Sequence, residues 1–138
     1  MAIRWKESYS CNIEAIDNQH KKLFEIGDEL YTIVTLDDGL DHYDEINSIL
    51  QKLKDYAIHH FNYEEELMGK YNYSELDEHR KQHDRFVNKV IELEHKDFDE
   101  DQKAISLKMV MFIADWIEKH ILGTDFKYKE FFDKKGIN

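Results

Sequence analysis

The absence of proline is the feature that most constrains what this chain can fold into. None of its 138 residues is proline and only five are glycine. Proline lacks a backbone N–H and clashes with the preceding helical turn, so a chain without it can form long uninterrupted helices. Charged residues make up 36% of the chain and hydrophobic residues 41%, which suits amphipathic helices around a buried core better than it suits disorder.

Four stretches of the chain carry apolar residues at the three- and four-residue spacing of a helix. The turn-like segments LDDGLD, YNYS and KDFDED separate them. We therefore predict an all-α fold, an up-down-up-down antiparallel four-helix bundle with an N-terminal arm and a short C-terminal helix. Gly69 and Gly123 are expected to end the second and fourth helices. The predicted single domain consists of an arm at 1–16, helices at about 17–36, 41–69, 74–96 and 101–122, and a C-terminal segment at 124–138.

The charge balance and the apolar runs exclude several partners. With 19 basic and 30 acidic residues the net charge is −11, so nucleic acid would be repelled, and no basic stripe offsets this. No apolar run approaches the ~20 residues of a membrane helix, and the first residues lack the apolar segment of a signal peptide. Cys11 is alone, so no intrachain disulfide can form. We expect a cytoplasmic protein without a membrane partner.

Five of the eight histidines fall on the apolar faces of the predicted helices. In the second helix, steps of three and four residues from Leu53 and Ala57 reach His60 and Glu64, whereas His59 is rotated by about 100° away. The same spacing directs four other histidines inward: His20, His79, His83 and His120. One inward histidine is usually a hydrogen-bonded core residue, but five would be costly to bury without a common partner.

The inward histidines are expected to share one level of the bundle. In an antiparallel helix pair, residues equidistant from the connecting turn lie at the same height. The pairs centred on the predicted turns are His60–His83, Glu64–His79, His20–His60 and His83–His120. By contrast, a rise of 1.5 Å per residue puts His42 ~27 Å and His95 ~18 Å from this layer along their helices. These two histidines are expected at the surface.

The layer offers five imidazoles and Glu64, and a helix broken at Gly123 could bring Asp125 back toward it as a second carboxylate. Seven ligands exceed the needs of one ion, but two six-coordinate ions that share bridging carboxylates would use them. Imidazole suits iron, zinc, copper and nickel alike, and the absence of thiolate argues against a structural zinc site.

These motifs resemble the ligand set of the hemerythrins. The matching segments are DNQH at 17–20, HxxxE at 60–64, HxxxH at 79–83 and HxxxxD at 120–125. Trp5 and the arm that leads to IDNQH are similar to the bacterial branch, the bacteriohemerythrins. The resemblance covers essentially the whole chain, and its ordered set of motifs is far more specific than a single HxxxH. One departure is Asn12, where many members have glycine.

The resemblance implies two non-haem iron ions joined by an oxo or hydroxo bridge. It implies that His79, His83 and His120 hold one iron, His20 and His60 hold the other, and Glu64 and Asp125 bridge them. The iron with two histidines would keep an open position, where dioxygen would bind reversibly and take one electron from each iron. The chain is thus expected to carry, store or deliver dioxygen and not to be an enzyme. Apolar residues expected to keep the oxygen pocket dry are Leu23, Phe61, Trp116, Ile117 and Ile121.

Three alternatives remain open from the sequence. An oxygen, iron or redox sensor could use the same centre, with its output supplied by a protein partner that the sequence does not identify. A di-iron oxidase would use four carboxylates and two histidines. ELEH at 92–95 matches its Glu-x-x-His motif, but His95 falls outside the histidine layer. A purely structural bundle would leave the buried histidines without a shared ligand.

Overall fold

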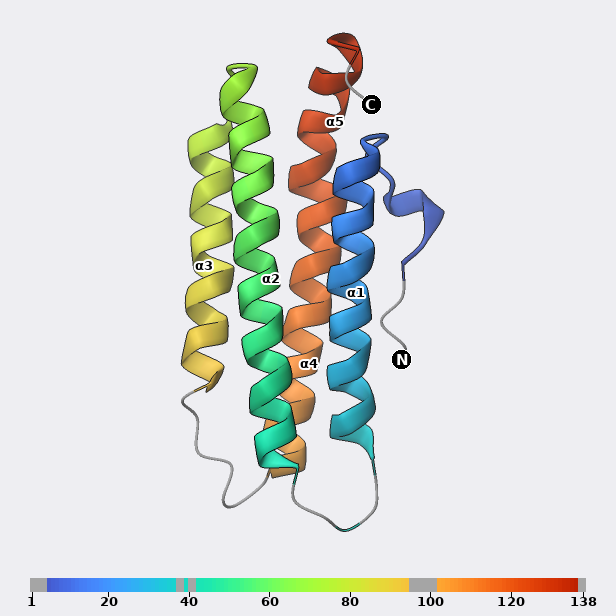
Figure 1. Cartoon of the computed structure of the whole chain (residues 1–138), viewed down its shortest axis with the longest axis vertical. Helices are drawn as coiled ribbons and strands as arrows, with labels where there is room; N and C mark the ends of the chain where they lie inside the picture. The colour runs from blue at the N-terminus through green and yellow to red at the C-terminus, as the bar shows by residue number, and fades with distance from the viewer. Residues whose placement is uncertain (1–4, 37–38, 40–41, 95–101, 137–138) are drawn as a thin grey trace.

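Four long helices lie side by side and alternate in direction (Figure 1). The structure is a computed structural model and describes residues 5–36, 39, 42–94 and 102–136. Within these ranges the elements are η1 (Glu7–Tyr9), α1 (Glu14–Thr35), α2 (Tyr43–Lys70), α3 (Leu76–Glu94), α4 (Gln102–Lys119), η2 (His120–Asp125) and α5 (Phe126–Lys134). No described residue lies in a strand. The predicted all-α antiparallel four-helix bundle is confirmed.

The helices pack so that α1 contacts both α2 and α4, and α2 also contacts α3. The arm with η1 lies on the outer side of α1, and α5 continues beyond α4 along the same side of the bundle (Figure 1). The segment 95–101, which contains His95, lies outside the described residues. No helix in the described ranges is both long enough and apolar enough to span a membrane.

The first helix begins three residues before the predicted start at residue 17. Ile13 and Ile16 are buried, and their spacing continues the inward stripe that leads to His20. Burial of this extra turn favours a helix that starts at Glu14, whose carboxylate is also favourable at a helix N-terminus. The predicted arm therefore ends at residue 13 rather than 16.

The arm is tied to two helices of the bundle. The Tyr9 ring stacks on Phe24 of α1 with ring centroids 5.2 Å apart, and Trp5 meets the same ring edge-on. The Tyr9 hydroxyl donates to Glu118 of α4 at 3.0 Å. Burial raises the pKa of the Tyr9 phenol, and the neighbouring Glu118 carboxylate raises it further. These contacts hold the arm across the seam between α1 and α4.

Asn12 adopts a backbone conformation that suits glycine as well as asparagine. Its φ of 64° lies in the left-handed region, which glycine adopts freely and asparagine tolerates better than most residues. Two hydrogen bonds span the turn at Asn12. The Cys11 N–H donates to the Asp17 carboxylate at 2.9 Å, and the Ser10 hydroxyl donates to the same carboxylate.

The second helix was predicted to end at Gly69, but it ends at Lys70. Asn72 has a φ of 57°, and its N–H donates to the Gly69 carbonyl at 3.3 Å. The N–H of Tyr73 donates to the Met68 carbonyl at 2.9 Å. This pair of bonds is a Schellman motif, in which the residue in the left-handed conformation stops the helix. Asparagine takes the role that the sequence analysis gave to glycine.

The end of α4 also differs from the expectation of a break at Gly123. The α-helical segment ends at Lys119, but the chain stays helical through the π-helical segment η2 and continues directly into α5. A π-helix joins residues five apart by hydrogen bonds, so each turn is wider than in an α-helix. The helix therefore becomes wider at His120–Asp125, and it is not broken at Gly123.

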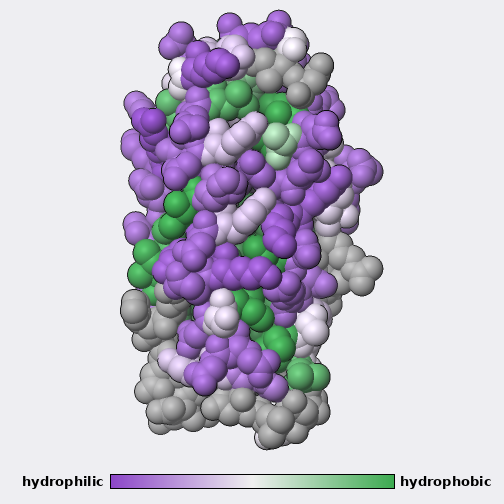
Figure 2. Space-filling model, in the orientation of Figure 1, coloured by the Kyte–Doolittle hydropathy of each residue, from purple (hydrophilic) through white to green (hydrophobic). Residues whose placement is uncertain are grey.

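Two apolar clusters lie on either side of the histidine layer. The larger contains, among others, Leu23, Phe24, Phe61, Phe86, Ile113 and Ile117. The smaller contains Cys11, Ile13, Ile16, Met68, Tyr73, Tyr128 and Phe132. On α1, for example, His20 falls between Ile16 of the smaller cluster and Leu23 of the larger. The outer surface in Figure 2 is mostly hydrophilic, with hydrophobic side chains visible only in narrow strips.

Candidate metal centre

The five histidines that the sequence directed inward are all buried. Their exposed fractions range from 0% to 5%, and Glu64 is fully buried among them. They come from four elements: His20 from α1, His60 from α2, His79 and His83 from α3, and His120 from η2. They form two groups, and within each group the potential ligand atoms lie within 4.8 Å of one another. One group is Glu64, His79, His83 and His120, and the other is His20, His60 and Glu64. The expectation that these residues meet at one level is confirmed.

The histidines expected elsewhere are not part of these groups. His59, the neighbour of His60, is exposed. His42 lies at the start of α2, where its Nδ1 is 3.0 Å from Glu45, and it is partly buried rather than fully at the surface. Rotation about the helix axis thus distinguishes His60 from His59, and height along the bundle distinguishes the clustered histidines from His42.

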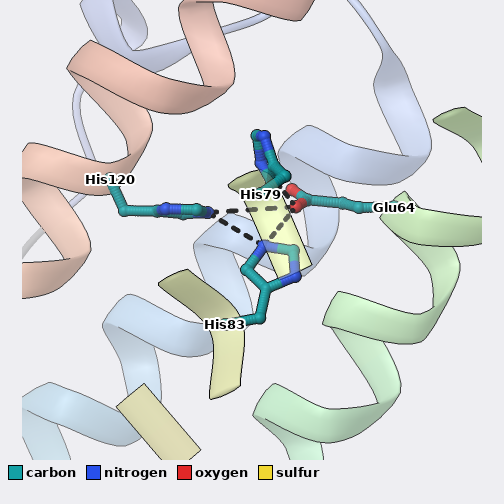
Figure 3. Close-up of side chains that lie close together, drawn as sticks. All are labelled: Glu64, His79, His83 and His120. Carbon is teal, nitrogen blue, oxygen red and sulfur yellow. Dashed lines mark hydrogen bonds and ion pairs between the residues drawn. The ribbon is translucent and has the colours of Figure 1, made fainter. Parts of the chain in front are cut away.

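Glu64 lies between the two histidine groups, and each of its oxygens faces a different group. Its Oε1 is 2.9 Å from His60 Nε2 and 3.3 Å from His20 Nε2. Figure 3 shows the other group, which converges on the carboxylate from α3 and η2. The distances from Glu64 Oε2 are 3.2, 3.6 and 4.0 Å to the Nε2 atoms of His83, His79 and His120. Glu64 therefore belongs to both groups, and each of them could hold a metal ion.

The spacing of these atoms matches the spacing of ligands around a metal ion. The Nε2 atoms of His83 and His120 are 3.2 Å apart. Adjacent ligands of a six-coordinate ion with bonds of ~2.1 Å lie roughly 3.0 Å apart, and opposite ligands roughly 4.2 Å apart. The separations of 3.2–4.0 Å between Glu64 Oε2 and the three Nε2 atoms fall in this range. That oxygen is buried and has no hydrogen-bond partner among the described residues.

The surroundings of Glu64 keep it in the carboxylate form that a metal requires. Burial raises the pKa of this carboxyl group. The charge of His60 and the polar contacts with the imidazoles of His120, His20 and His60 lower the pKa more, so it lies well below its ordinary value. A deprotonated oxygen pair among imidazole nitrogens is a suitable ligand set for iron and other divalent transition metals.

Polar side chains from neighbouring positions hold three of the imidazoles in place. The Nδ1 atoms of His60, His83 and His120 face Gln19 at 2.6 Å, Glu65 at 3.3 Å and Gln82 at 3.3 Å. An acceptor at Nδ1 orients the ring and leaves the Nε2 lone pair available to a metal.

These three acceptors were not predicted from the sequence. Each is adjacent in sequence to an inward ligand, so it borders the inner face of its own helix and can reach a histidine on another helix. That adjacency is the signal that could have found them.

Tyr128 is a further residue that the sequence analysis missed. It is fully buried in α5, and its hydroxyl donates to Glu64 Oε1 at 3.0 Å. Its ring also stacks on His79, with centroids 5.5 Å apart. The predicted C-terminal helix therefore does more than pack against the bundle, because its Tyr128 contacts both Glu64 and His79.

The five residues predicted to line an oxygen pocket fall into two sets, two aromatic and three aliphatic. Phe61 stacks on His83 at 3.9 Å and Trp116 stacks on His120 at 4.5 Å, so both rings contact the group with three histidines. The aliphatic side chains of Leu23, Ile117 and Ile121 are buried in the larger apolar cluster. The two aromatic rings thus contact the imidazoles directly, and the three aliphatic residues belong to the apolar cluster next to them.

Asp125 occupies the last position of η2, five residues after His120. This separation equals the hydrogen-bonded repeat of a π-helix, so the backbone places the two positions one π-helical turn apart. The side chain of Asp125 lies outside the described part of the chain, and its role as a ligand stays a prediction.

Comparison with known proteins identifies the family. The family model for the hemerythrin HHE cation binding domain matches residues 11–132, which include every residue of the cluster. The chain is 38% identical over 124 residues to a bacteriohemerythrin of Clostridium acetobutylicum, covering 90% of this chain and 96% of that protein. It is 32% identical to a hemerythrin-like protein of Naegleria gruberi, covering 91% and 89% of the two chains. It is 29% identical to a myohemerythrin of Theromyzon tessulatum, covering 91% and 90%. The chain belongs to the hemerythrin family.

Proposed function

We propose that this protein binds dioxygen reversibly at a centre of two iron ions. The observation that carries the proposal is the position of Glu64, whose two oxygens face a group of two histidines and a group of three. Membership of the hemerythrin family supports the same assignment. The proposed ligands are His20 and His60 for one iron, His79, His83 and His120 for the other, and Glu64 and Asp125 for both.

The two groups provide different numbers of nitrogen ligands, two and three, so the two irons would have different numbers of open positions. Iron bound at this centre would supply two electrons, one from each ion, for the reversible capture of dioxygen. His20 and His60 leave one more position unfilled than the group with three histidines does. We therefore assign dioxygen to the side of the centre that His20 and His60 form.

The protein's own contribution is to exclude water and to hold the ligands still. The apolar clusters lie on both sides of the histidine layer, and Leu23, Ile117 and Ile121 are almost fully buried beside it. Tyr128 fixes Glu64 by its hydrogen bond at 3.0 Å. A dry site strengthens electrostatic interactions and slows the proton transfer that would accompany irreversible oxidation.

The ligand set favours binding over oxidative catalysis. Oxygen-activating di-iron bundles use four carboxylates and two histidines. The proposed set has five neutral imidazoles and only two carboxylates, which stabilise highly oxidised iron less. The protein is accordingly proposed as a binding protein and not as an enzyme.

The proposal is tested by one optical cycle on iron-loaded protein. The reduced protein is recorded under argon, after admission of air, and again after the air is removed. A visible band should appear with air and disappear without it, through several cycles. His59→Ala is the matched control and should cycle like the wild type, whereas Glu64→Ala should bind little iron and show no band. A spectrum that does not change with air, or that changes once and never returns, would contradict reversible binding.

A further inference from the structure

The Nδ1 partners of His60, His83 and His120 differ in charge. His60 and His120 face neutral amide oxygens, from Gln19 and Gln82. His83 instead faces the carboxylate Oε2 of Glu65, at 3.3 Å. A negative charge therefore lies one imidazole ring away from the group with three histidines.

The Glu65 carboxylate is held in this orientation from the other side. Arg80, one turn into α3, donates from Nε to Glu65 Oε1 at 2.9 Å. Each oxygen of Glu65 thus has its own partner, and the pair with Arg80 directs Oε2 toward His83. One face of the His83 ring is covered by the Phe61 ring, which lies almost parallel to it at an angle of 6°.

We propose that Glu65 sets the redox balance of the centre by polarising His83. An anion that accepts the Nδ1–H proton increases the electron donation of the imidazole through Nε2. A more strongly donating ligand stabilises ferric iron more than ferrous iron, so Glu65 should lower the reduction potential. This inference rests on the proposed iron centre but assigns a positioning role to a residue that is not a ligand.

The location of Glu65 makes the charge testable without disturbing the fold. Its side chain is 19% exposed and lines an open pocket of about 380 Å³ between α2 and α3, together with Phe61, His83 and Val87. Glu65→Gln keeps the shape and can present its one amide oxygen to His83. Its amide nitrogen cannot accept from Arg80 Nε, so the Arg80 hydrogen bond is lost, and solvent in the pocket can satisfy both donors. The variant therefore removes the charge while keeping the hydrogen bond to His83.

The experiment is a redox titration of iron-loaded protein with dithionite as electron donor and ferricyanide as acceptor, followed by absorbance. Each iron gains or loses one electron. Glu65→Gln should lower the ratio of ferric to ferrous iron at a fixed potential about tenfold, a rise in midpoint of ~59 mV per electron. Gln82→Glu places a carboxylate on His120 and should shift the ratio in the opposite direction. The double variant should lie close to the wild type, and Glu66→Gln, at an exposed neighbouring position, should not shift it.

Iron analysis of each sample separates this inference from the proposed function. If wild type lacks two irons per chain, the centre itself is wrong. If wild type and Glu65→Gln both hold two irons and have the same midpoint, the role of Glu65 is wrong while the centre stands. Opposite shifts in Glu65→Gln and Gln82→Glu would support charge as the cause. A shift of the same sign in both variants would indicate general disturbance of the site and overturn the inference.

Discussion

His59 and His60 are adjacent in the chain but have opposite surroundings. His60 is fully buried with its Nε2 2.9 Å from Glu64, whereas His59 is exposed. His60→Ala should therefore lose most of the bound iron, by a factor well above the 10–100-fold typical of residues that only support a ligand. His59→Ala should retain it. The measurement is iron per chain after dialysis against a weak chelator, and equal losses in the two variants would refute the proposed ligand role of His60.

Tyr128 offers a second test at the scale of one atom. Tyr128→Phe removes the hydroxyl that donates to Glu64 but keeps the ring that stacks on His79. A net hydrogen bond to a charged group contributes about 1.5–3 kcal/mol, and loss of a supporting residue typically weakens metal binding about tenfold or more. Iron affinity from chelator competition should fall accordingly, while the exposed Tyr63→Phe should not change it. Equal affinities in the two variants would assign the hydroxyl no part in orienting Glu64.

The residues that the sequence predicted and those it missed differ in a physical way. The inward direction of His20 or His83 follows from helical periodicity, which depends only on backbone geometry. The partners Gln19, Glu65 and Gln82 lie at the border of an apolar face. Their contacts depend on side-chain rotamers and on the neighbouring helix, which periodicity along one chain does not contain.

The helix ends illustrate the same limit at the scale of elements. The positions of the turns were predicted well enough to align the histidines, but the residues that end the helices were not. Gly69 lies inside the last turn of α2, and Asn72 supplies the left-handed conformation instead. Ile13 and Ile16 extend α1 toward the N-terminus, because they pack in the smaller apolar cluster that only the folded chain forms.

The π-helical segment η2 gives a prediction about Gly123. A Cβ atom added to this exposed glycine would meet no other atom within 4 Å, so alanine fits without strain. Gly123→Ala should retain iron and raise stability by about 0.5–1 kcal/mol through the lower entropy of the unfolded chain. Gly39→Ala is the matched contrast, because the φ of Gly39 is +71° and alanine there costs about 1–2 kcal/mol. Thermal unfolding midpoints should move in opposite directions. A fall in both would mean that η2 requires the glycine.

At the scale of the whole molecule, the histidine layer interrupts an otherwise continuous apolar interior. Five imidazoles and a carboxylate lie between the two apolar clusters. Such a layer favours folding only when its polar atoms are satisfied, and a ligand that binds the folded state alone stabilises it. The bundle is thus expected to depend on its metal for stability as well as for function.

Removal of iron should therefore destabilise the wild type. Ligand present at 100 times its dissociation constant contributes about 2.7 kcal/mol, so chelation should lower the unfolding midpoint clearly. The control is His60→Ala, in which chelator should cause little further change because little iron is bound. Identical midpoints for iron-loaded and stripped wild type would show that the layer is stable without metal and would weaken the case for a metal centre.

The most direct test of reversible dioxygen binding at a shared two-iron centre is the ratio of bound dioxygen to iron. Reduced, iron-loaded protein is titrated with dioxygen in a closed cell, and the gas released under vacuum is then measured with the iron content of the same sample. We expect one dioxygen taken up for every two irons, two irons per chain, and release of nearly all of the bound gas. Uptake of one dioxygen per single iron, or uptake without release, would contradict it.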